Sequence, residues 1–274
     1  MSAIDPHFQF SQSSLQDYAD CARRFELRYL MALRYPAAEA EPIAEHERQM
    51  QMGAVFHRMV QQHLLGIPAE RLSIGIDDTL LAQWWQHYLT YGLADLPANR
   101  SPEVTLWTTI AGYRVIAKYD LIAAMPGERI VIVDWKTAQQ RPKRATLAQR
   151  WQTLVYRCVL VEAGAQLNGG LAVQPEQIEM RYWFAEYPQQ PEVFSYSTAE
   201  YRHDRVQLEA CIREIAVRTQ FELTSDVSRC RFCTYRSLCQ RGVVAGDLAQ
   251  QVADGDDSPV TIVFDFDQIA EIEF

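Results

Sequence analysis

Three apolar runs in the middle of the chain, 103–110, 113–122 and 129–134, constrain its fold most. Each has the length and composition of a β-strand, and Ala111-Gly112 between the first two is typical of a tight turn. Helical periodicity covers 13–33, 45–65, 78–91, 145–163 and 198–221, and 178–185 alternates like a further strand. This order predicts an α/β domain whose central mixed sheet is flanked by helices, rather than a doubly wound parallel fold.

The third run ends in two charged residues of opposite sign. Asp134 and Lys136 lie two positions apart, so a strand places both on one face and turns Trp135 to the other, toward the core. Asp120 ends the preceding run and can approach Asp134 across the sheet. Two carboxylates at such a short distance repel each other, and a divalent cation between them removes the repulsion. The other interpretation is an edge salt bridge between Asp134 and Lys136, worth about 0–1 kcal/mol.

Polar residues on two helical segments extend this candidate site. His57 follows Gly53-Ala-Val-Phe in the segment 45–65, and neutral imidazole is a suitable third ligand beside two carboxylates. Carboxylates with one His fit Mn²⁺ or Mg²⁺ better than a closed zinc site. Gln152 and Tyr156 share a helix face and could position a phosphate or a water. Equally, His57 could be a satisfied polar residue and Tyr156 a packed core residue.

Four of the six cysteines form a second pattern. Cys230-x-x-Cys233-x5-Cys239 is a tight cluster that needs one more ligand for a soft metal, and Cys21 lies far upstream. Zinc and an iron–sulfur cluster both fit this spacing, as do unlinked thiols. A metal or cluster that joined Cys21 to Cys230–Cys239 would hold the two ends of the domain together. Closing so long a loop would stabilise the fold by several kcal/mol, about the value expected for a crosslink of this kind. The remaining two, Cys158 and Cys211, fall in apolar helical patterns and are predicted to be buried.

Net charge is −9, which is unusual for a protein that binds nucleic acid, but the charge is unevenly distributed. Residues 247–274 hold eight acids and no Lys or Arg, so residues 1–246 carry a net charge of only −1. Within 136–150 and 229–241 there are basic residues and no acids, which could attract a polyanion or be solvated faces. We expect one domain over 1–246 and an acidic C-terminal tail over 247–274.

Taken together, these residues resemble a known family. The series Gly53-x-x-x-His57, Asp120, Asp134-x-Lys136 and Gln152-x-x-x-Tyr156 is similar to the RecB-like branch of the PD-(D/E)XK nuclease superfamily. One Cys before these motifs and Cys-x2-Cys-x5-Cys after them resembles its iron–sulfur members, among them the CRISPR-associated adaptation exonuclease and AddB-type nuclease domains. The segment Ser13 to Phe25 is also similar, although Ala22 stands where many relatives have Pro.

The resemblance implies a fold and a set of roles. It implies a restriction-endonuclease-like core and a helical region associated with a [4Fe-4S] cluster. His57, Asp120, Asp134 and the Trp135 carbonyl would bind Mn²⁺ or Mg²⁺, and Lys136 would act on the attacking water and the transition state. The supporting pair would be Gln152 and Tyr156. The cluster ligands would be Cys21, Cys230, Cys233 and Cys239, with zinc as the alternative occupant.

The resulting functional hypothesis is a metal-dependent DNA nuclease, an exonuclease on single strands or duplex ends, acting in DNA processing, repair or CRISPR-type adaptation. The alternative is a catalytically weak nucleic-acid-binding or adaptor protein of the same fold. No Gly-x-x-x-x-Gly-Lys-[Ser/Thr] loop is present, so a helicase or other DNA-processing protein is a candidate partner. No apolar run suits a membrane span or a secretory signal, so no membrane partner and a cytoplasmic location are expected.

Overall fold

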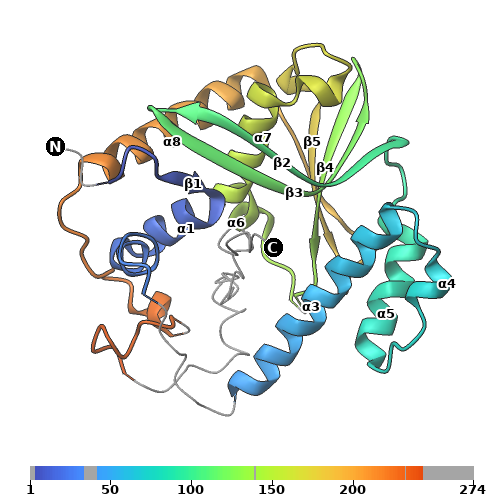
Figure 1. Ribbon diagram of the computed structural model, residues 1–274, viewed down its shortest axis with the longest axis horizontal. Coiled ribbons are helices and arrows are strands. Elements are labelled where there is room, and N and C mark those ends of the chain that lie inside the picture. Colours follow the sequence, from blue (N-terminus) through green and yellow to red (C-terminus); the bar gives the residue numbers. More distant parts are fainter. Residues whose placement is uncertain (1–3, 34–41, 139, 232, 243–274) are drawn as a thin grey trace, which may run out of the picture.

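A mixed β-sheet lies at the centre of the computed structural model, which describes residues 4–33, 42–138, 140–231 and 233–242 (Figure 1). The strand order is β1-β3-β4-β5-β6, and β2 pairs with the other edge of β3. The strands are β1 Gln9–Ser11, β2 Asn99–Ile110, β3 Tyr113–Met125, β4 Arg129–Lys136, β5 Ile178–Phe184 and β6 Glu192–Ser195. Pairs β1·β3 and β4·β5 are parallel and the others antiparallel, which confirms the expected mixed sheet.

Helices cover both faces of this sheet. They are α1 Gln12–Asp20, α2 Ala22–Phe25, α3 Pro42–Leu64, α4 Ala69–Leu72, α5 Thr79–His87, α6 Arg144–Ala148, α7 Trp151–Ala163 and α8 Thr198–Val217. One core forms where α7, α8 and α1 pack on the sheet, and includes Tyr119, Val155 and Ile212. A second core, on the side of α3 and α5, is rich in aromatic rings such as Trp84, Trp85 and Trp183. The mixed α/β architecture with flanking helices is therefore as predicted.

Several local predictions were wrong. The first helical segment is not continuous: it breaks at Cys21, whose extended backbone (φ −164°, ψ 110°) separates α1 from α2. A π-helical turn, Glu26–Leu30, continues α2. The segment 145–163 also divides, into α6 and α7, and α8 ends at Val217 rather than 221. The short edge strands β1 and β6 were not expected, because each is defined by its partner rather than by a long apolar run.

Ser11 is the N-cap of α1, where its side chain accepts the backbone N–H of Ser14. The Ser14 hydroxyl lies 2.9 Å from the Ser11 backbone nitrogen, which completes a capping box. β1 therefore runs directly into α1 at this residue.

The β2–β3 hairpin is kinked at one position. Its register runs without interruption from Asn99 opposite Ala124 to Ile110 opposite Tyr113, except that the pair Glu103–Asp120 is missing. Glu103 has a φ of 54°, in the left-handed region that only glycine enters easily. The alternation of side chains between the two faces of β3 is interrupted here. Tyr119 points into the core on the α7 side, whereas Leu121, two residues later, points into the core on the α3 side.

A gap in the edge pairing of β3 coincides with this kink. On one edge, β3 pairs with β1 as far as Ile116, and with β4 from Leu121 onward. Between these two partners, no strand of the described chain lies beside Ala117 to Asp120 on that edge. The side chain of Asp120 can therefore reach past the edge toward the end of β4. This break in the ladder is where the predicted site residues gather.

Residues near both ends of the described chain lie side by side. The Tyr235 hydroxyl donates to the Leu33 carbonyl (2.8 Å), and the Arg23 N–H donates to Glu222 (3.1 Å). Arg229 pairs with Asp20 of α1 (3.3 Å). The predicted acidic tail, 247–274, lies outside the described residues. Within the described chain, no helix is long and apolar enough to span a membrane.

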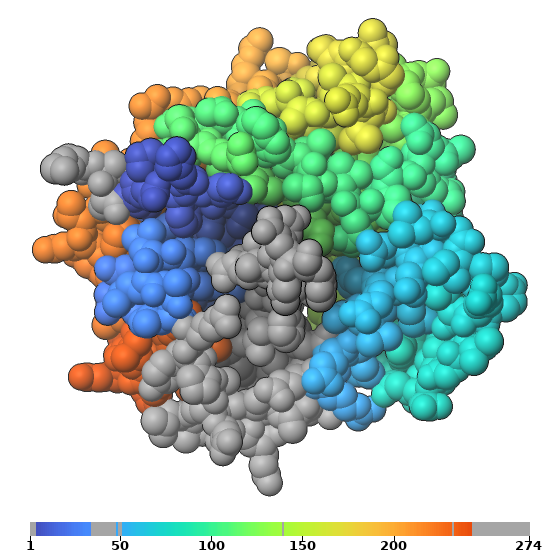
Figure 2. All heavy atoms as spheres, viewed as in Figure 1, coloured from blue at the N-terminus to red at the C-terminus, as the bar shows by residue number. Residues whose placement is uncertain are grey.

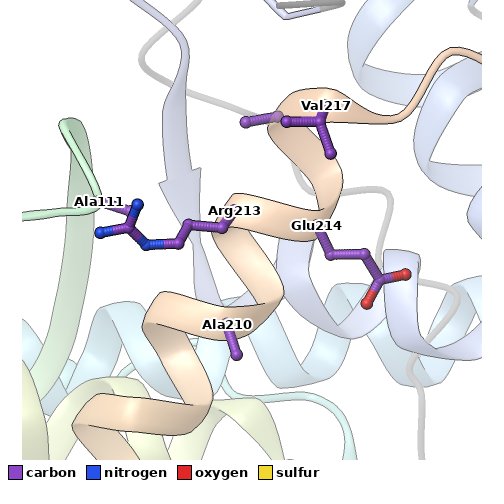
Figure 3. A pocket seen from close by; sticks show the side chains of 6 residues that line it. Ala111, Ala210, Arg213, Glu214 and Val217 are labelled. Carbon is purple, nitrogen blue, oxygen red and sulfur yellow. The ribbon is translucent and has the colours of Figure 1, made fainter.

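A surface depression lies beside α8, near the tip of the β2–β3 hairpin (Figure 3). It is lined by Ala111, Ala210, Arg213, Glu214, Ala216 and Val217. None of the residues predicted for chemistry lines it, so the candidate site lies elsewhere.

Candidate active site

Asp120 and Asp134 face each other at the break in the ladder. Leu121 pairs with Val133, so continuing that register by one step places Asp120 opposite Asp134. The ladder does not continue, because Oδ2 of Asp120 accepts the backbone N–H of Trp135 (2.9 Å) in place of a strand partner. The acid of β3 is thus anchored to the backbone next to the acid of β4.

Lys136 and Gln152 hold the Asp134 carboxylate. Gln152, on α7, donates its amide N–H to Oδ1 of Asp134 (2.7 Å) and accepts from the Lys136 ammonium (3.2 Å). Lys136 Nζ also lies 2.7 Å from Oδ2 of Asp134. Only 3% of Asp134 is exposed, so these partners replace most of its water. The prediction that Asp134 and Lys136 share one face is confirmed, and Trp135 is buried among aromatic rings on the other.

His57 reaches the same carboxylates from α3. Its Nδ1 lies 3.6 Å from Oδ1 of Asp120. Gly53, one turn earlier, explains how α3 comes so close: a Cβ on Gly53 would lie 2.8 Å from Oγ1 of Thr137, just after β4. The spacing Gly53-x-x-x-His57 therefore has a geometric reason, since the glycine allows close packing and the histidine follows one turn later.

The charges of these groups are interdependent. Burial raises the pKa of Asp134, the Lys136 ammonium opposes that rise, and the charge of Asp120 adds to it. For Asp120, burial is outweighed by His57 and by the Trp135 N–H, so its pKa is lowered. For His57, burial is outweighed by the Asp120 carboxylate, so its pKa is raised. Asp120 therefore ionises readily, whereas its surroundings oppose the ionisation of Asp134.

These donors fit a divalent cation. Two carboxylates and one imidazole converge, and Oδ2 of Asp134 is buried with the Lys136 ammonium 2.7 Å away. A cation bound by these oxygens would remove the repulsion between the acids. Trp135 directs its N–H toward Asp120. In a β-strand the N–H and the carbonyl of one residue point to the same side, so the Trp135 carbonyl also faces the side of Asp120. No three His, Cys, Asp or Glu side chains of the described residues are already close enough to bind a metal ion.

Tyr156 and Gln12 border the site. Tyr156 is buried, packs on the ring of Tyr119 (centroids 4.7 Å apart), and its hydroxyl accepts from the amide of Gln12 (3.4 Å). Burial raises the pKa of Tyr156, and the charges of Asp134 and Asp120 add to the rise. Tyr156 is therefore a packed core residue whose polar end faces the site, which combines the two interpretations of the sequence.

The sequence predictions missed Gln12 and Thr137. Gln12 is the first residue of α1 and approaches Tyr156 only because β1 pairs with β3, a contact between residues 144 positions apart. Neither residue belongs to a spacing pattern within the chain. Thr137 could have been suspected, since it directly follows Lys136 and a glycine at position 53 must face something close.

The predicted cysteine ligands come from two distant segments that the structure brings together. Cys21, at the break between α1 and α2, lies near enough to Cys230, Cys233 and Cys239 that a negative charge on it would raise the pKa of each, but no three of the described cysteines are already close enough to hold a metal ion. Burial raises the pKa of Cys233 to about 11, although the nearby Arg24 opposes that rise. Cys158 is fully buried as predicted, whereas Cys211 is partly exposed, which corrects the prediction for that residue.

Comparisons with known proteins identify the family of this chain and a solved structure of similar fold. The model of the family described as the PD-(D/E)XK nuclease superfamily matches residues 9–240. A crystal structure from Eubacterium rectale, provisionally described as an exonuclease, is 10% identical with a TM-score of 0.52, covering 89% of this chain and 92% of its own. The structure of SSO0001 is 12% identical with a TM-score of 0.39, covering 86% of this chain and 87% of its own. No curated protein sequence matches significantly.

Proposed function

Because the chain belongs to the PD-(D/E)XK nuclease superfamily, we propose that it is a metal-dependent deoxyribonuclease that acts on single strands or duplex ends. Nucleases of this superfamily hydrolyse phosphodiester bonds. The choice of DNA, of Mn²⁺ or Mg²⁺, and of an exonuclease mode are the parts we propose. The observation that carries the proposal is the joint anchoring of Asp134 and Lys136 by Gln152, opposite Asp120.

Each residue of the site has a proposed part in the reaction. His57, Asp120, Asp134 and the carbonyl of Trp135 would hold the ion. A bound Mg²⁺ or Mn²⁺ supplies charge that acidifies a water and offsets the charge on the phosphate. Lys136 lies between Asp134 and Gln152, where its ammonium can orient the attacking water or meet the charge that develops on the phosphate. Gln152 holds Lys136 and Asp134 together through its amide, and Tyr156, one turn further along α7, would support Gln152.

A cleavage assay tests this function. End-labelled single-stranded and blunt duplex DNA are incubated with the full chain and Mn²⁺ or Mg²⁺, comparing wild type with Asp134→Ala and Lys136→Ala. We expect each variant to cleave at least about 10²-fold more slowly, the usual cost of losing one group that stabilises the transition state. Unchanged metal-dependent cleavage in both variants would refute the site. Tight DNA binding without cleavage by the wild type would instead favour a binding or adaptor protein.

We further propose that Cys21, Cys230, Cys233 and Cys239 bind a [4Fe-4S] cluster. Contacts between the two segments, the ion pair of Arg229 with Asp20 and the hydrogen bond of Tyr235 to Leu33, support a shared site. Such a cluster would act as a structural clip between the ends of the domain rather than as a redox catalyst.

Iron content and visible absorption of anaerobically purified protein test the cluster. We expect a broad absorption band in the wild type and in a Cys211→Ser control, and its loss in Cys21→Ser and Cys230→Ser. Cys211 is the matched control because it is a partly exposed cysteine outside the four. A colourless wild-type protein that carries one zinc ion would show that zinc occupies the site instead.

A further inference from the structure

The outer face of the β2–β3 hairpin is open to solvent and leads to the candidate active site. From the kink to the hairpin tip, the side chains on this face are Thr105, Trp107 and Thr109 of β2, and Arg114, Ile116 and Lys118 of β3. All are exposed except Ile116, which is half-buried. The opposite face packs on α7. In Figure 2, the green spheres of the hairpin form part of the surface that faces the viewer.

We propose that this face is a track on which a single strand of DNA lies as it enters the site. The proposal rests on the nuclease function proposed above and names where the strand is held. In this assignment the ring of Trp107 stacks on a base, and Arg114 and Lys118 contact the phosphates on either side. Thr105 and Thr109 flank the ring and offer hydroxyl groups to the backbone.

Trp107 has the exposure and the support of a stacking platform. About half of Trp107 (51%) is exposed, whereas Trp84, Trp85, Trp135 and Trp183 are buried and Trp151 is half-buried. The guanidinium of Arg114 lies 4.4 Å from the Trp107 ring centroid, so a cation–π contact holds the ring in place from one side. An ordered, exposed aromatic ring beside a cation combines the two features by which proteins bind single strands.

The charges on the face are complementary to a polyanion. Arg114 and Lys118 carry two positive charges, against the one negative charge of Glu103, in a chain whose net charge is −9. Lys118 pairs with Glu103 at 3.0 Å, yet 58% of the lysine side chain is exposed, so its ammonium remains accessible to a phosphate. A local positive face in an acidic protein directs a nucleic acid to one surface.

The basic residues of this face precede Asp120 on the same strand, β3. Lys118 is two residues before Asp120, and Arg114 is four residues before Lys118. At about 3.3 Å per strand residue, the track from Arg114 to Asp120 is about 20 Å long. A strand on this track therefore reaches the break in the ladder where Asp120, Asp134 and His57 meet. Stacking needs an unpaired base, which favours a single strand over a duplex.

Fluorescence anisotropy with a labelled oligo(dT) tests the track, using the full chain in EDTA so that no cleavage occurs. We expect Trp107→Ala to weaken binding about 5- to 150-fold, the range measured for the loss of one base–aromatic stack, and Trp107→Phe to weaken it much less. Blunt duplex DNA should bind Trp107→Ala within about twofold of the wild type. Arg114→Ala with Lys118→Ala should reduce the slope of log affinity against log salt by about 1.4, since each phosphate contact contributes about 0.7.

Arg202→Ala is the matched control, because Arg202 is an exposed arginine on α8, which packs on the opposite face of the sheet from the track. It should bind oligo(dT) as the wild type does. If Trp107→Ala and the double variant also bind like the wild type, the track is wrong. If Trp107→Ala loses single-stranded and duplex affinity equally, the assignment to a single strand is wrong. Cleavage by the wild type against Asp134→Ala decides the nuclease proposal separately, so the two failures are distinguishable.

Discussion

Glu103 lies opposite Asp120 in the β2–β3 hairpin, and theirs is the one pair missing from an otherwise continuous register. Glu103 takes a left-handed backbone conformation (φ 54°) there, and β3 turns its side chains over to the other face of the sheet. The kink frees the backbone around Asp120 from the ladder. The carboxylate can then bind the N–H of Trp135, which orients it toward Asp134.

This strain predicts opposite effects of two substitutions at Glu103. Glu103→Gly should leave the free energy of unfolding unchanged or raise it, because glycine accepts this φ without cost. Glu103→Val should lower it, because glutamate already has a Cβ at this φ whereas a β-branched side chain is disfavoured there still further. Urea unfolding of both variants checks this, with Glu103→Ala as the control for the lost ion pair with Lys118. Equal stability of the glycine and valine variants would contradict the strain.

The contact between Gly53 and Thr137 predicts a loss of activity without a loss of stability. A Cβ at position 53 would lie 2.8 Å from Thr137 Oγ1, so Gly53→Ala should push α3 and His57 away from Asp120. DNA cleavage should fall by about 10-fold or more, since small misplacements of this kind cost up to about 10²-fold. Thermal stability should hold or rise, because alanine favours a helix over glycine by about 1 kcal/mol.

A double variant separates packing from any other effect of that alanine. Thr137→Ala removes the hydroxyl that the new Cβ would meet, while Cβ of Thr137 lies 3.9 Å away, an ordinary contact distance. Gly53→Ala with Thr137→Ala should therefore recover most of the cleavage rate that Gly53→Ala loses. Additive losses in the double variant would show that the close packing is not the cause.

Gln152 links the acid and the lysine, so its loss should disturb both. Gln152→Leu removes a donor from Asp134 and an acceptor from Lys136, and we expect cleavage to fall about 10- to 100-fold, as for other supporting residues of metal sites. Gln152→Glu adds a negative charge beside Asp134, which should raise the pKa of that acid further. Because Asp134 must be ionised to bind a cation, the acid limb of the pH–rate profile should move to higher pH. A profile that does not move would contradict the link.

The repulsion between Asp120 and Asp134 predicts that the site is unfavourable without a cation. Burial and the charge of Asp120 hold the pKa of Asp134 above its usual range, so its ionised form destabilises the fold. Asp134→Asn should then raise the thermal midpoint in EDTA by a few degrees, since about 1 kcal/mol shifts it by about 2–4 °C. Mn²⁺ should raise the midpoint of the wild type and not that of the variant. A lower midpoint for Asp134→Asn in EDTA would contradict the repulsion.

Much of the candidate site was readable because its pattern is local. Alternation along a strand places Asp134 and Lys136 on one face whatever the rest of the chain does, and helical spacing places Gln152 and Tyr156 together. The strands that carry Asp120 and Asp134 were expected because apolar runs of this length, separated by a turn, are typical of neighbouring strands. The mixed sheet followed from the order of those runs.

Contacts between distant segments were not readable in this way. The break of the first helix at Cys21 and the short strand β1 depend on what packs against them, and so does the approach of Gln12 to Tyr156. The kink at Glu103 has no local signal, since Glu is an unusual residue for a positive φ. Predictions on the acidic tail concern residues outside the described chain.

The amino-acid sequence by itself determined which residues share a face, because side-chain direction along a strand or helix follows from a fixed period. Only the tertiary structure decided how those faces meet. The switch of β3 from β1 to β4 opens the ladder at Asp120, and the missing side chain at Gly53 lets α3 bring His57 to that opening. Pairing and close packing join residues far apart in the chain, so no period within it can specify them.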